Sequence, residues 1–264
     1  MSAAFPPLSV VTGAGSGIGL ALAHALLERG HEVVAIDLDV SCIDPRAQRH
    51  ALDVRDAAGM EAIAAAMAGR PVHHVFANAG IGAAGDVLTA SESTWQWAWD
   101  VNVTAALRTL RLWWPHLREG RGKAVATVSS AALQSYPGAG PYRATKAALL
   151  AALEGLHYQS RGTGVTVHAL CPGMVRTQVT EVARYAEAAQ LAPEGPNPFA
   201  DYVRQAMLRA EPAEAFAERV LDTLWEGAPF YWFTHPETRD WIAQRHRLIE
   251  SGGLPFSDFA RGAP

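Results

Sequence analysis

The stretch TGAGSGIG, residues 12–19, places its glycines between an apolar, β-branched run and a helical pattern. The run LSVVTG (8–13) predicts a strand, and LALAHALLERG (20–30) predicts an amphipathic helix that ends at Gly30. Gly13, Gly17 and Gly19 permit positive φ and close backbone approach, while the start of the helix offers unpaired N–H donors to a phosphate. Taken alone, the loop fits either a phosphate cradle or a simple turn between strand and helix.

The same alternation of strand and helix continues along the chain. Further apolar or β-branched runs are HEVVAID (31–37), VHHVFANAG (72–80), KAVATVSS (123–130), VTVHALCPG (165–173) and PFYWFT (229–234). Such alternation predicts βαβ units. The expected fold class is therefore α/β: one doubly wound domain over residues 1–264, with a parallel sheet flanked by helices.

Two segments interrupt this rhythm. Residues 178–212 contain three prolines within six positions, which predicts a long connection without a regular element. Long connections of this kind are often substrate lids, and we expect one here. Residues 236–264 follow the last predicted strand and form a C-terminal helical tail in this interpretation.

Composition excludes several classes of protein. The chain has 264 residues, a net charge of −4, and no run of five or more Lys or Arg, so nucleic acid is not an expected partner. No apolar stretch reaches about 18 residues and no secretory signal opens the chain, so we expect a cytoplasmic protein without a membrane contact. The two cysteines, Cys42 and Cys171, lack metal-ligand spacing and are expected to be reduced, with no metal site.

An acidic residue at the end of the second predicted strand favours the phosphate cradle. Asp37 lies about 20 residues beyond the glycine loop, where a carboxylate can accept hydrogen bonds from both ribose hydroxyls of an adenosine. The loop and Asp37 together predict dinucleotide binding.

With further motifs, the sequence resembles the short-chain dehydrogenase/reductase family in its single-domain form, over roughly residues 8–235. The matching positions are the loop Thr12-Gly13-Ala14-Gly15-Ser16-Gly17-Ile18-Gly19, the triplet Asn78-Ala79-Gly80, Asn102, Ser130, the pair Tyr142 and Lys146, and the run from Pro172 and Gly173 through Val175 to Thr177. The resemblance implies a Rossmann-type fold and hydride transfer to or from a nicotinamide cofactor. By analogy it also implies a homodimer or homotetramer.

The resemblance assigns further cofactor contacts. Asp53 and Val54 would contact the adenine, and Val175 with Thr177 would contact the nicotinamide carboxamide. Asp37 would repel a 2′-phosphate, and neither Ser16 nor Leu38 supplies a cation for one. We therefore expect NAD (NADH) to be preferred over NADP.

The proposed chemistry depends on the acidity of a phenol. PYRATKAALLAAL (141–153) predicts a helix, so Tyr142 and Lys146 at i and i+4 share a face. Without the other motifs, such a pair would be better explained as a solvated surface pair. A free Tyr has a pKa of about 10, and lowering it to about 7 needs roughly 4 kcal/mol of phenolate stabilisation. Lys146 and a positively charged nicotinamide would supply it. Ser130 would hydrogen-bond the substrate oxygen, and in the family Asn102 helps to hold a water that connects the Lys to solvent.

The serine position is open to a second assignment. The family's Ser commonly lies 13 residues before the Tyr; Ser130 lies 12 before Tyr142 and Ser129 lies 13 before it. The match to the SSAA motif favours Ser130, with Ser129 as the alternative. The family also often has Asn where Ala77 stands, and Asp where His73 stands, which weakens a supporting hydrogen bond.

Substrate choice is assigned to five residues: Leu133, Gln134, Tyr136, Met174 and Tyr202. They are mostly apolar or aromatic and include no fixed cation, so we expect a neutral secondary alcohol or its ketone. The alternatives are a 3-oxoacyl-type ketoreductase, a dihydrodiol dehydrogenase, or a non-catalytic NAD(H)-binding redox sensor. The full set of Ser, Tyr, Lys and Asn argues against the sensor.

Overall fold

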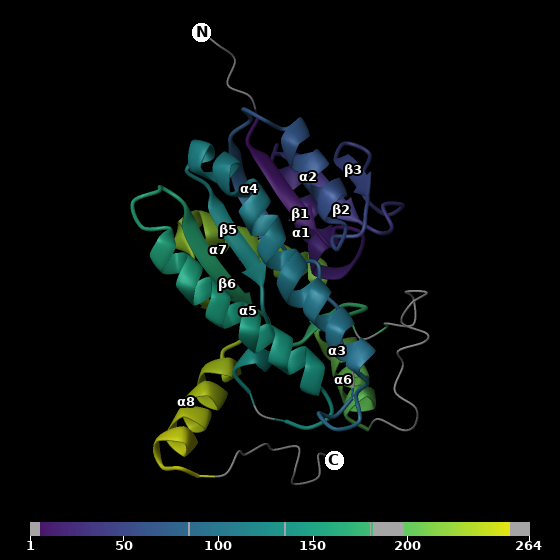
Figure 1. Cartoon of the computed structure of the whole chain (residues 1–264), viewed down its shortest axis with the longest axis vertical. Helices are drawn as coiled ribbons and strands as arrows, with labels where there is room; N and C mark the ends of the chain where they lie inside the picture. The colour runs from purple at the N-terminus through teal and green to yellow at the C-terminus, as the bar shows by residue number, and fades with distance from the viewer. Residues whose placement is uncertain (1–5, 84, 135, 180, 182–197, 254–264) are drawn as a thin grey trace.

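A seven-stranded parallel sheet forms the centre of the computed structural model (Figure 1), which describes residues 6–83, 85–134, 136–179, 181 and 198–253. The strand order is β3-β2-β1-β4-β5-β6-β9. The strands are β1 (Leu8–Thr12), β2 (Glu32–Asp37), β3 (Gln48–Ala51), β4 (Val72–Ala77), β5 (Lys123–Thr127), β6 (Thr166–Cys171) and β9 (Tyr231–Phe233). Chain order reverses between β1 and β4, and the carboxyl ends of strands beside such a reversal are where doubly wound folds bind ligands.

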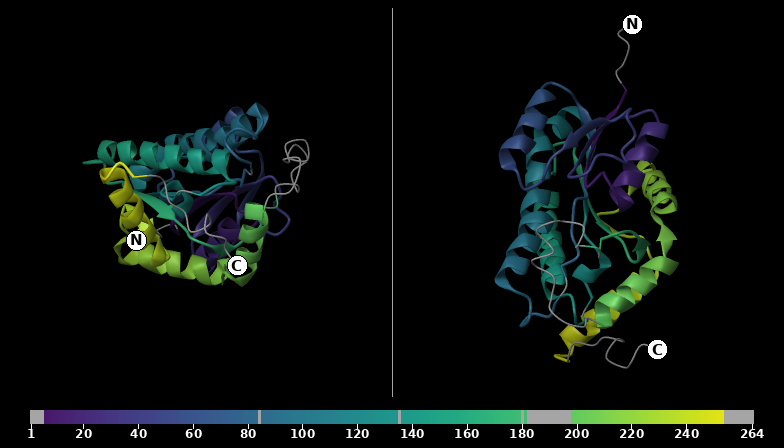
Figure 2. Two further views of the ribbon diagram at one scale, coloured as in Figure 1. Left: turned by 90° about the horizontal axis from the view of Figure 1, so that it is seen from below. Right: turned by 90° about the vertical axis from the view of Figure 1, so that its right-hand side faces the viewer.

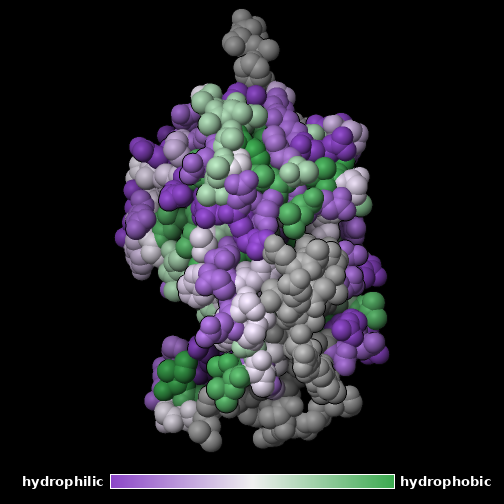
Figure 3. All heavy atoms as spheres, turned by 45° about the vertical axis from the view of Figure 1, so that its right-hand side comes forward, coloured by the Kyte–Doolittle hydropathy of each residue, from purple (hydrophilic) through white to green (hydrophobic). Residues whose placement is uncertain are grey.

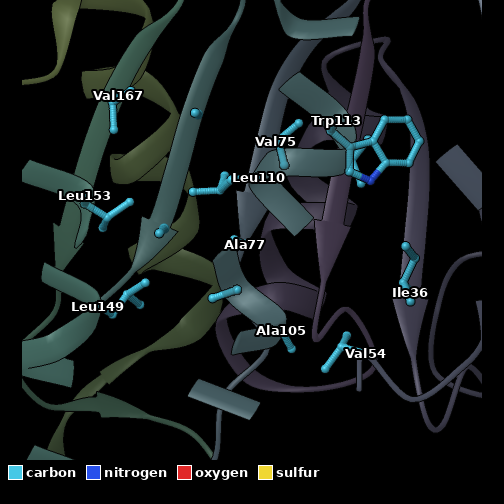
Figure 4. Packing of buried hydrophobic residues seen from close by; sticks show 14 of the residues in the cluster. Ile36, Val54, Val75, Ala77, Ala105, Leu110, Trp113, Leu149, Leu153 and Val167 are labelled. Atoms are coloured by element: carbon cyan, nitrogen blue, oxygen red, sulfur yellow. The ribbon is translucent and has the colours of Figure 1, made fainter. Parts of the chain in front are cut away.

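Helices cover both faces of the sheet, as Figure 2 shows. One face carries α1 (Gly17–Glu28) and α7 (Ala213–Gly227), and the other carries α2 (Ala57–Ala66), α4 (Ala106–Gly120) and α5 (Gly140–Gln159). On the second face, Trp113 and Leu110 of α4 pack against Val75 of the sheet (Figure 4). Full burial of one such side chain contributes about 1.5–3 kcal/mol, so these layers hold the strand ends in place.

Shorter elements complete the chain. Between α2 and α4 lie α3 (Glu92–Trp99) and a π-helix (Asp100–Ala105), and a 3₁₀-helix (Ser130–Ala132) follows β5. A two-stranded sheet pairs β7 (Val175–Arg176) with β8 (Glu211–Pro212), and α6 (Pro198–Arg209) precedes β8. Last comes α8 (Glu237–Glu250), of which Thr238 alone is buried, and which extends away from the sheet in Figure 1.

The predicted α/β class and parallel sheet are confirmed, with two corrections. All six predicted strands are present, but β3 was missed because QRHA at 48–51 has no apolar run from which to predict an edge strand. Residues 178–212 are not wholly irregular, since α6 begins at Pro198, and a proline is tolerated in a first turn. Residues 180 and 182–197 of the predicted lid, and 254–264 of the predicted tail, lie outside the described residues.

One face of the molecule mixes hydrophilic and apolar residues (Figure 3). Figure 3 shows one face on which hydrophilic residues are interspersed with smaller apolar groups. Among the helices that the structure describes, none is long and apolar enough to cross a membrane.

Candidate active site

The glycine loop is closed tightly around the end of β1. Gly13 and Gly17 have φ of +68° and +53°, and the N–H groups of Gly13 and Ala14 both donate to the carbonyl of Ile36. A Cβ on Gly19 would lie 1.9 Å from the carbonyl oxygen of Gly13, so no side chain fits there. The loop therefore requires glycine both for positive φ and for close backbone packing. It leads directly into the N-terminus of α1.

The start of α1 suits an anion. Ser16 is the N-cap residue, its side chain does not cap the first turn, and no acidic residue occupies that turn. Gly17, Ile18 and Gly19 open the helix, where backbone N–H groups and the helix dipole attract negative charge. These residues fit the pyrophosphate of a dinucleotide.

Asp37 lies beside this loop, at the end of β2. One carboxylate oxygen accepts from the N–H of Gly15 at 2.8 Å and the other accepts from the N–H of Asp39 at 3.1 Å. A Cβ on Gly15 would lie 2.8 Å from the carboxyl carbon of Asp37. Leu38, the next residue, is 53% exposed. The structure thus brings the predicted ribose ligand against the predicted phosphate loop.

Asn78 joins three strands at the same end of the sheet. The hydroxyl of Thr12 accepts from the N–H groups of Asn78 (3.1 Å) and Ala79 (3.2 Å), and the amide of Asn78 donates to the carbonyls of Thr12 and Gly13. The Oδ1 atom of Asn78 accepts from the hydroxyl of Thr127 at 2.9 Å. The glycine loop is therefore fixed relative to the end of β5, where the catalytic candidates begin.

Lys146 is buried next to the end of β5, beside the contact between Asn78 and Thr127. Only 3% of it is exposed, and its Nζ donates to the carbonyl oxygen of Thr127 at 2.8 Å. Burial lowers the pKa of Lys146 to about 8. Its Nζ lies 5.9 Å from the centroid of the Tyr142 ring, so the two predicted partners share a face of α5.

Tyr142 contacts Ser129, the alternative serine. Burial raises the pKa of Tyr142, and a hydrogen bond with the side chain of Ser129 opposes that rise. The hydroxyl of Ser129 also accepts from the N–H of Ala131 at 3.1 Å, which fixes its position at the start of the 3₁₀-helix.

Ser130, the preferred serine in the sequence, is placed differently. It is 8% exposed, and its N–H donates to the carbonyl of Pro172 at 2.8 Å. Strand β5 ends at Thr127, so Ser130 belongs to the 3₁₀-helix and not to the strand end. Of the two serines, Ser129 is the one whose side chain acts on the pKa of the phenol, which favours the alternative assignment. The spacing of 13 residues before Tyr142 also fits Ser129.

Asn102 lies in the π-helix and is completely buried. Its Oδ1 accepts from the N–H of Ile81 at 2.9 Å, and its Nδ2 donates to the carbonyl of Ile81 and the hydroxyl of Thr145, both at 3.1 Å. A Cβ on Gly80 would lie 3.3 Å from both Asn102 Oδ1 and Lys146 Nζ. The side chain of Asn102 thus joins the end of β4 to α5, next to Lys146.

The segment from Pro172 to Thr177 turns back toward the glycine loop. A Cβ on Gly17 would lie 3.1 Å from the side chain of Thr177, and Val175 is buried in the pairing of β7 with β8. The N–H of Gly173 donates to Nδ1 of His235 at 3.0 Å. Sequence reasoning missed His235, because it lies 62 positions further along the chain and belongs to no motif.

Asp53 and Val54, the predicted adenine contacts, are held by hydrogen bonds from two arginines. Arg55 forms an ion pair with Asp53 at 2.6 Å; burial opposes ionisation of Asp53, but the hydrogen bonds from Arg55 leave its pKa lowered. Arg108 of α4 donates to the carbonyls of Val54 and Arg55, which fixes this turn against α4. Val54 is 8% exposed.

The five predicted substrate residues fall into separate groups. Leu133 packs on the core, while the carbonyls of Gln134 and Tyr136 accept from Arg143. Burial raises the pKa of Tyr136. Met174 lines a cavity of about 580 Å³ with residues of α6, β8 and α7, and the described residues that line it include neither Tyr142 nor Lys146. Tyr202, on α6, is 42% exposed. The first three therefore lie on the segment that precedes Tyr142, and Met174 lies on the segment that follows Pro172.

Comparison with known proteins shows which family the chain resembles. The model of the short chain dehydrogenase family matches residues 8–188. The 2-(R)-hydroxypropyl-CoM dehydrogenase of Xanthobacter autotrophicus is 31% identical over 191 residues, which cover 66% of this chain and 76% of that protein. Galactitol 2-dehydrogenase (L-tagatose-forming) of Cereibacter sphaeroides is 34% identical over 184 residues, which cover 65% and 72%.

A solved structure extends the likeness to nearly the whole chain. A short-chain dehydrogenase/reductase of Burkholderia phymatum, in complex with NAD, has a TM-score of 0.83 and 29% identity, covering 96% of this chain and 97% of that one. The family match alone spans more than half of the sequence and contains every strand end that carries the site. The protein therefore belongs to the short-chain dehydrogenase/reductase family of oxidoreductases, which act on alcohols and ketones.

Proposed function

We propose that the protein is an NAD-dependent dehydrogenase of neutral secondary alcohols, with Tyr142 as the general acid and base. The observation that carries this proposal is the position of Lys146, which is buried with its Nζ 5.9 Å from the centroid of the Tyr142 ring. NAD, when bound, would accept the hydride from the carbinol carbon. Gly13, Ser16 to Gly19, Asp37 and the Asn78 junction would hold it.

The phenol needs help to lose its proton near neutral pH. Burial raises the pKa of Tyr142, so in the free protein the neutral phenol is favoured. An ammonium on Lys146 acts in the opposite direction, and burial brings the pKa of Lys146 only to about 8, so near neutrality most of it keeps its charge. We propose that Lys146 lowers the pKa of the Tyr142 phenol in the loaded enzyme. We also propose that Asn102 holds the loop after β4 against helix α5.

Ser129 would bind the substrate oxygen. Its hydroxyl already lies within hydrogen-bond reach of Tyr142, so an alcohol between the two would donate to one and accept from the other. A donor aimed at a developing alkoxide typically contributes a factor of about 10² to 10³ in kcat. We therefore transfer to Ser129 the role that the sequence motif assigned to Ser130.

Preference for NAD is proposed from Asp37. Its carboxylate lies against the glycine loop, with Leu38 as its neighbour, and a 2′-phosphate at this position would meet like charge at close range. Solved structures similar to this chain hold NAD or NADP, so the proposed preference rests on Asp37. Val54 with Asp53 would contact the adenine, and Val175 with Thr177 would contact the carboxamide.

The substrate class is proposed as a secondary alcohol or ketone without a charged group. The names of two relatives, galactitol 2-dehydrogenase and meso-2,3-butanediol dehydrogenase, each describe oxidation at a secondary carbinol. Leu133, Gln134 and Tyr136 would contact the substrate beside Tyr142, with Met174 and Tyr202 contributing from the segment that follows Pro172. We also propose a homodimer or homotetramer, in which α4 and α5 meet a second copy.

The test is oxidation of aliphatic, cyclic and aryl secondary alcohols and of dihydrodiols with NAD and with NADP, and reduction of acyl-chain ketones with NADH and with NADPH. Turnover is followed by the absorbance of the reduced cofactor. We expect turnover with NAD that Tyr142→Phe abolishes. Turnover only on acyl-chain ketones or dihydrodiols would select one of the alternative enzyme activities. Tight NADH binding without turnover on any substrate class would favour the redox sensor, and full activity of Tyr142→Phe would overturn the mechanism.

A further inference from the structure

His235 contacts the segment from Pro172 to Thr177, which is proposed to bind the nicotinamide. Its Nδ1 accepts from the N–H of Gly173 at 3.0 Å, and its Nε2 lies 3.1 Å from the carbonyl oxygen of Met174. A carbonyl can only accept, so Nε2 carries the proton and Nδ1 carries the lone pair. One imidazole therefore binds two successive backbone groups of the segment, and in only one tautomer.

The ring is held against Gly173 with no space between them. A Cβ on Gly173 would lie 2.7 Å from Cγ of His235, so the glycine is what allows this approach. The hydroxyl of Thr234 lies 2.9 Å from Nδ1, and the ring of Phe216 stacks on the other side with centroids 6.4 Å apart. The position of the imidazole is thus determined by its surroundings before any ligand binds.

Neighbouring contacts connect the same segment to α7. Val175 pairs with Glu211 of β8, and Glu211 forms an ion pair with Arg219 of α7 at 2.5 Å. Arg219 also donates to the carbonyl of Thr234 at 3.0 Å, one residue before His235. Gly173 to Val175 is therefore enclosed by a ring of contacts through β8, α7 and the residues after β9.

From these contacts we infer that His235 is a positioning residue for the nicotinamide end of the cofactor site. It fixes Gly173 and Met174, and through them the residues Val175 and Thr177. The inference rests on the proposed function, because it takes these two residues to contact the carboxamide. It does not require that His235 touch cofactor or substrate, and its effect is confined to the nicotinamide half of the dinucleotide.

Three substitutions separate positioning from packing. His235→Ala removes both hydrogen bonds, His235→Asn keeps an acceptor near Nδ1 for Gly173, and His235→Gln keeps a donor near Nε2 for Met174. The probes are NADH and ADP-ribose, whose binding is titrated by fluorescence and by calorimetry. ADP-ribose lacks the nicotinamide and so reports on the glycine loop and Asp37 alone.

We expect His235→Ala to bind NADH about 5- to 10-fold more weakly, with ADP-ribose affinity unchanged within about twofold. His235→Asn should recover NADH affinity to within about twofold of the natural chain, and His235→Gln should not. The inference is overturned if His235→Ala weakens both probes equally, if it weakens neither, or if Gln restores binding as well as Asn does. Failure of the natural chain to bind NADH would overturn the proposed function itself, and this inference with it.

Discussion

Acidification should destabilise this protein through two buried imidazoles, His31 and His74, which lie at the other end of the sheet from the glycine loop. The hydroxyl of Ser9 contacts Nδ1 of His31 at 2.9 Å and Nδ1 of His74 at 3.2 Å, and Trp225 packs against both rings. Burial lowers the pKa of His31 to about 4 and that of His74 to about 3. Both residues are less than one-tenth exposed, so solvent does little to screen this effect.

The direction follows from where the protons bind. In the unfolded chain each imidazole has a pKa of about 6.5 and takes up a proton as the pH falls, whereas in the folded protein both rings stay neutral until about pH 4. Stability contributed by the neutral rings is therefore present above about pH 6.5 and is lost on acidification. Between about pH 7.5 and pH 5, each ring should lower the free energy of unfolding by about 2 kcal/mol, or about 4 kcal/mol for both. That is a large part of a typical total stability of about 5–15 kcal/mol.

The assay is urea unfolding followed by circular dichroism at both pH values, on the natural chain and on the double variant His31→Asn/His74→Asn. Asn retains a polar group near Nδ1 for Ser9 but does not titrate, and all other groups are common to both proteins. Between about pH 7.5 and pH 5, the free energy of unfolding of the double variant should fall by about 4 kcal/mol less than that of the natural chain. Equal losses in the two proteins would refute the reasoning, because the acid sensitivity would then belong to other groups.

Further predictions concern the site. Ser129→Ala should lower kcat by about 10² to 10³, and Ser130→Ala by less than about tenfold, in steady-state assays with the best alcohol; the opposite order would restore the motif-based assignment. Asp37→Ala should reduce the NAD-over-NADP ratio of kcat/KM by about tenfold or more, since it removes the carboxylate that would repel a 2′-phosphate; an unchanged ratio would end the cofactor argument. Gly19→Ala should abolish NADH binding or lower the thermal midpoint by several degrees, because its Cβ would lie 1.9 Å from a carbonyl oxygen; a variant with natural affinity and midpoint would contradict the geometry.

Most of the fold was predictable because its strands are buried on both faces and read as apolar runs between helices. The edge strand β3 was not, since QRHA is only partly buried and carries no such pattern. Helix α6 was hidden by the prolines in front of it, although only Pro198 belongs to the helix.

The candidate site shows the same division. The glycine loop and the Tyr142–Lys146 pair are local in sequence, so a motif describes them well. The choice between Ser129 and Ser130 depends on the turn after β5, and the contact between His235 and Gly173 joins segments 62 positions apart. The spacing of 13 residues points to Ser129 while the SSAA motif points to Ser130, so local sequence leaves that choice open. The contact of His235 leaves no trace in spacing, because it depends on how distant segments pack.

The π-helix has a consequence for how this chain can vary. A π turn holds one residue more than the α-helical turn it replaces, and each residue rotates a helix by about 100°. Helix α4 is therefore out of phase with α3 by one position, which allows Asn102 to point at Ile81 while Trp113 still points into the core. Deletion of one residue between 100 and 105 would restore a continuous α-helix, but only one of these two side chains could then keep its place. Length, and not only composition, is thus constrained in this stretch of the sequence.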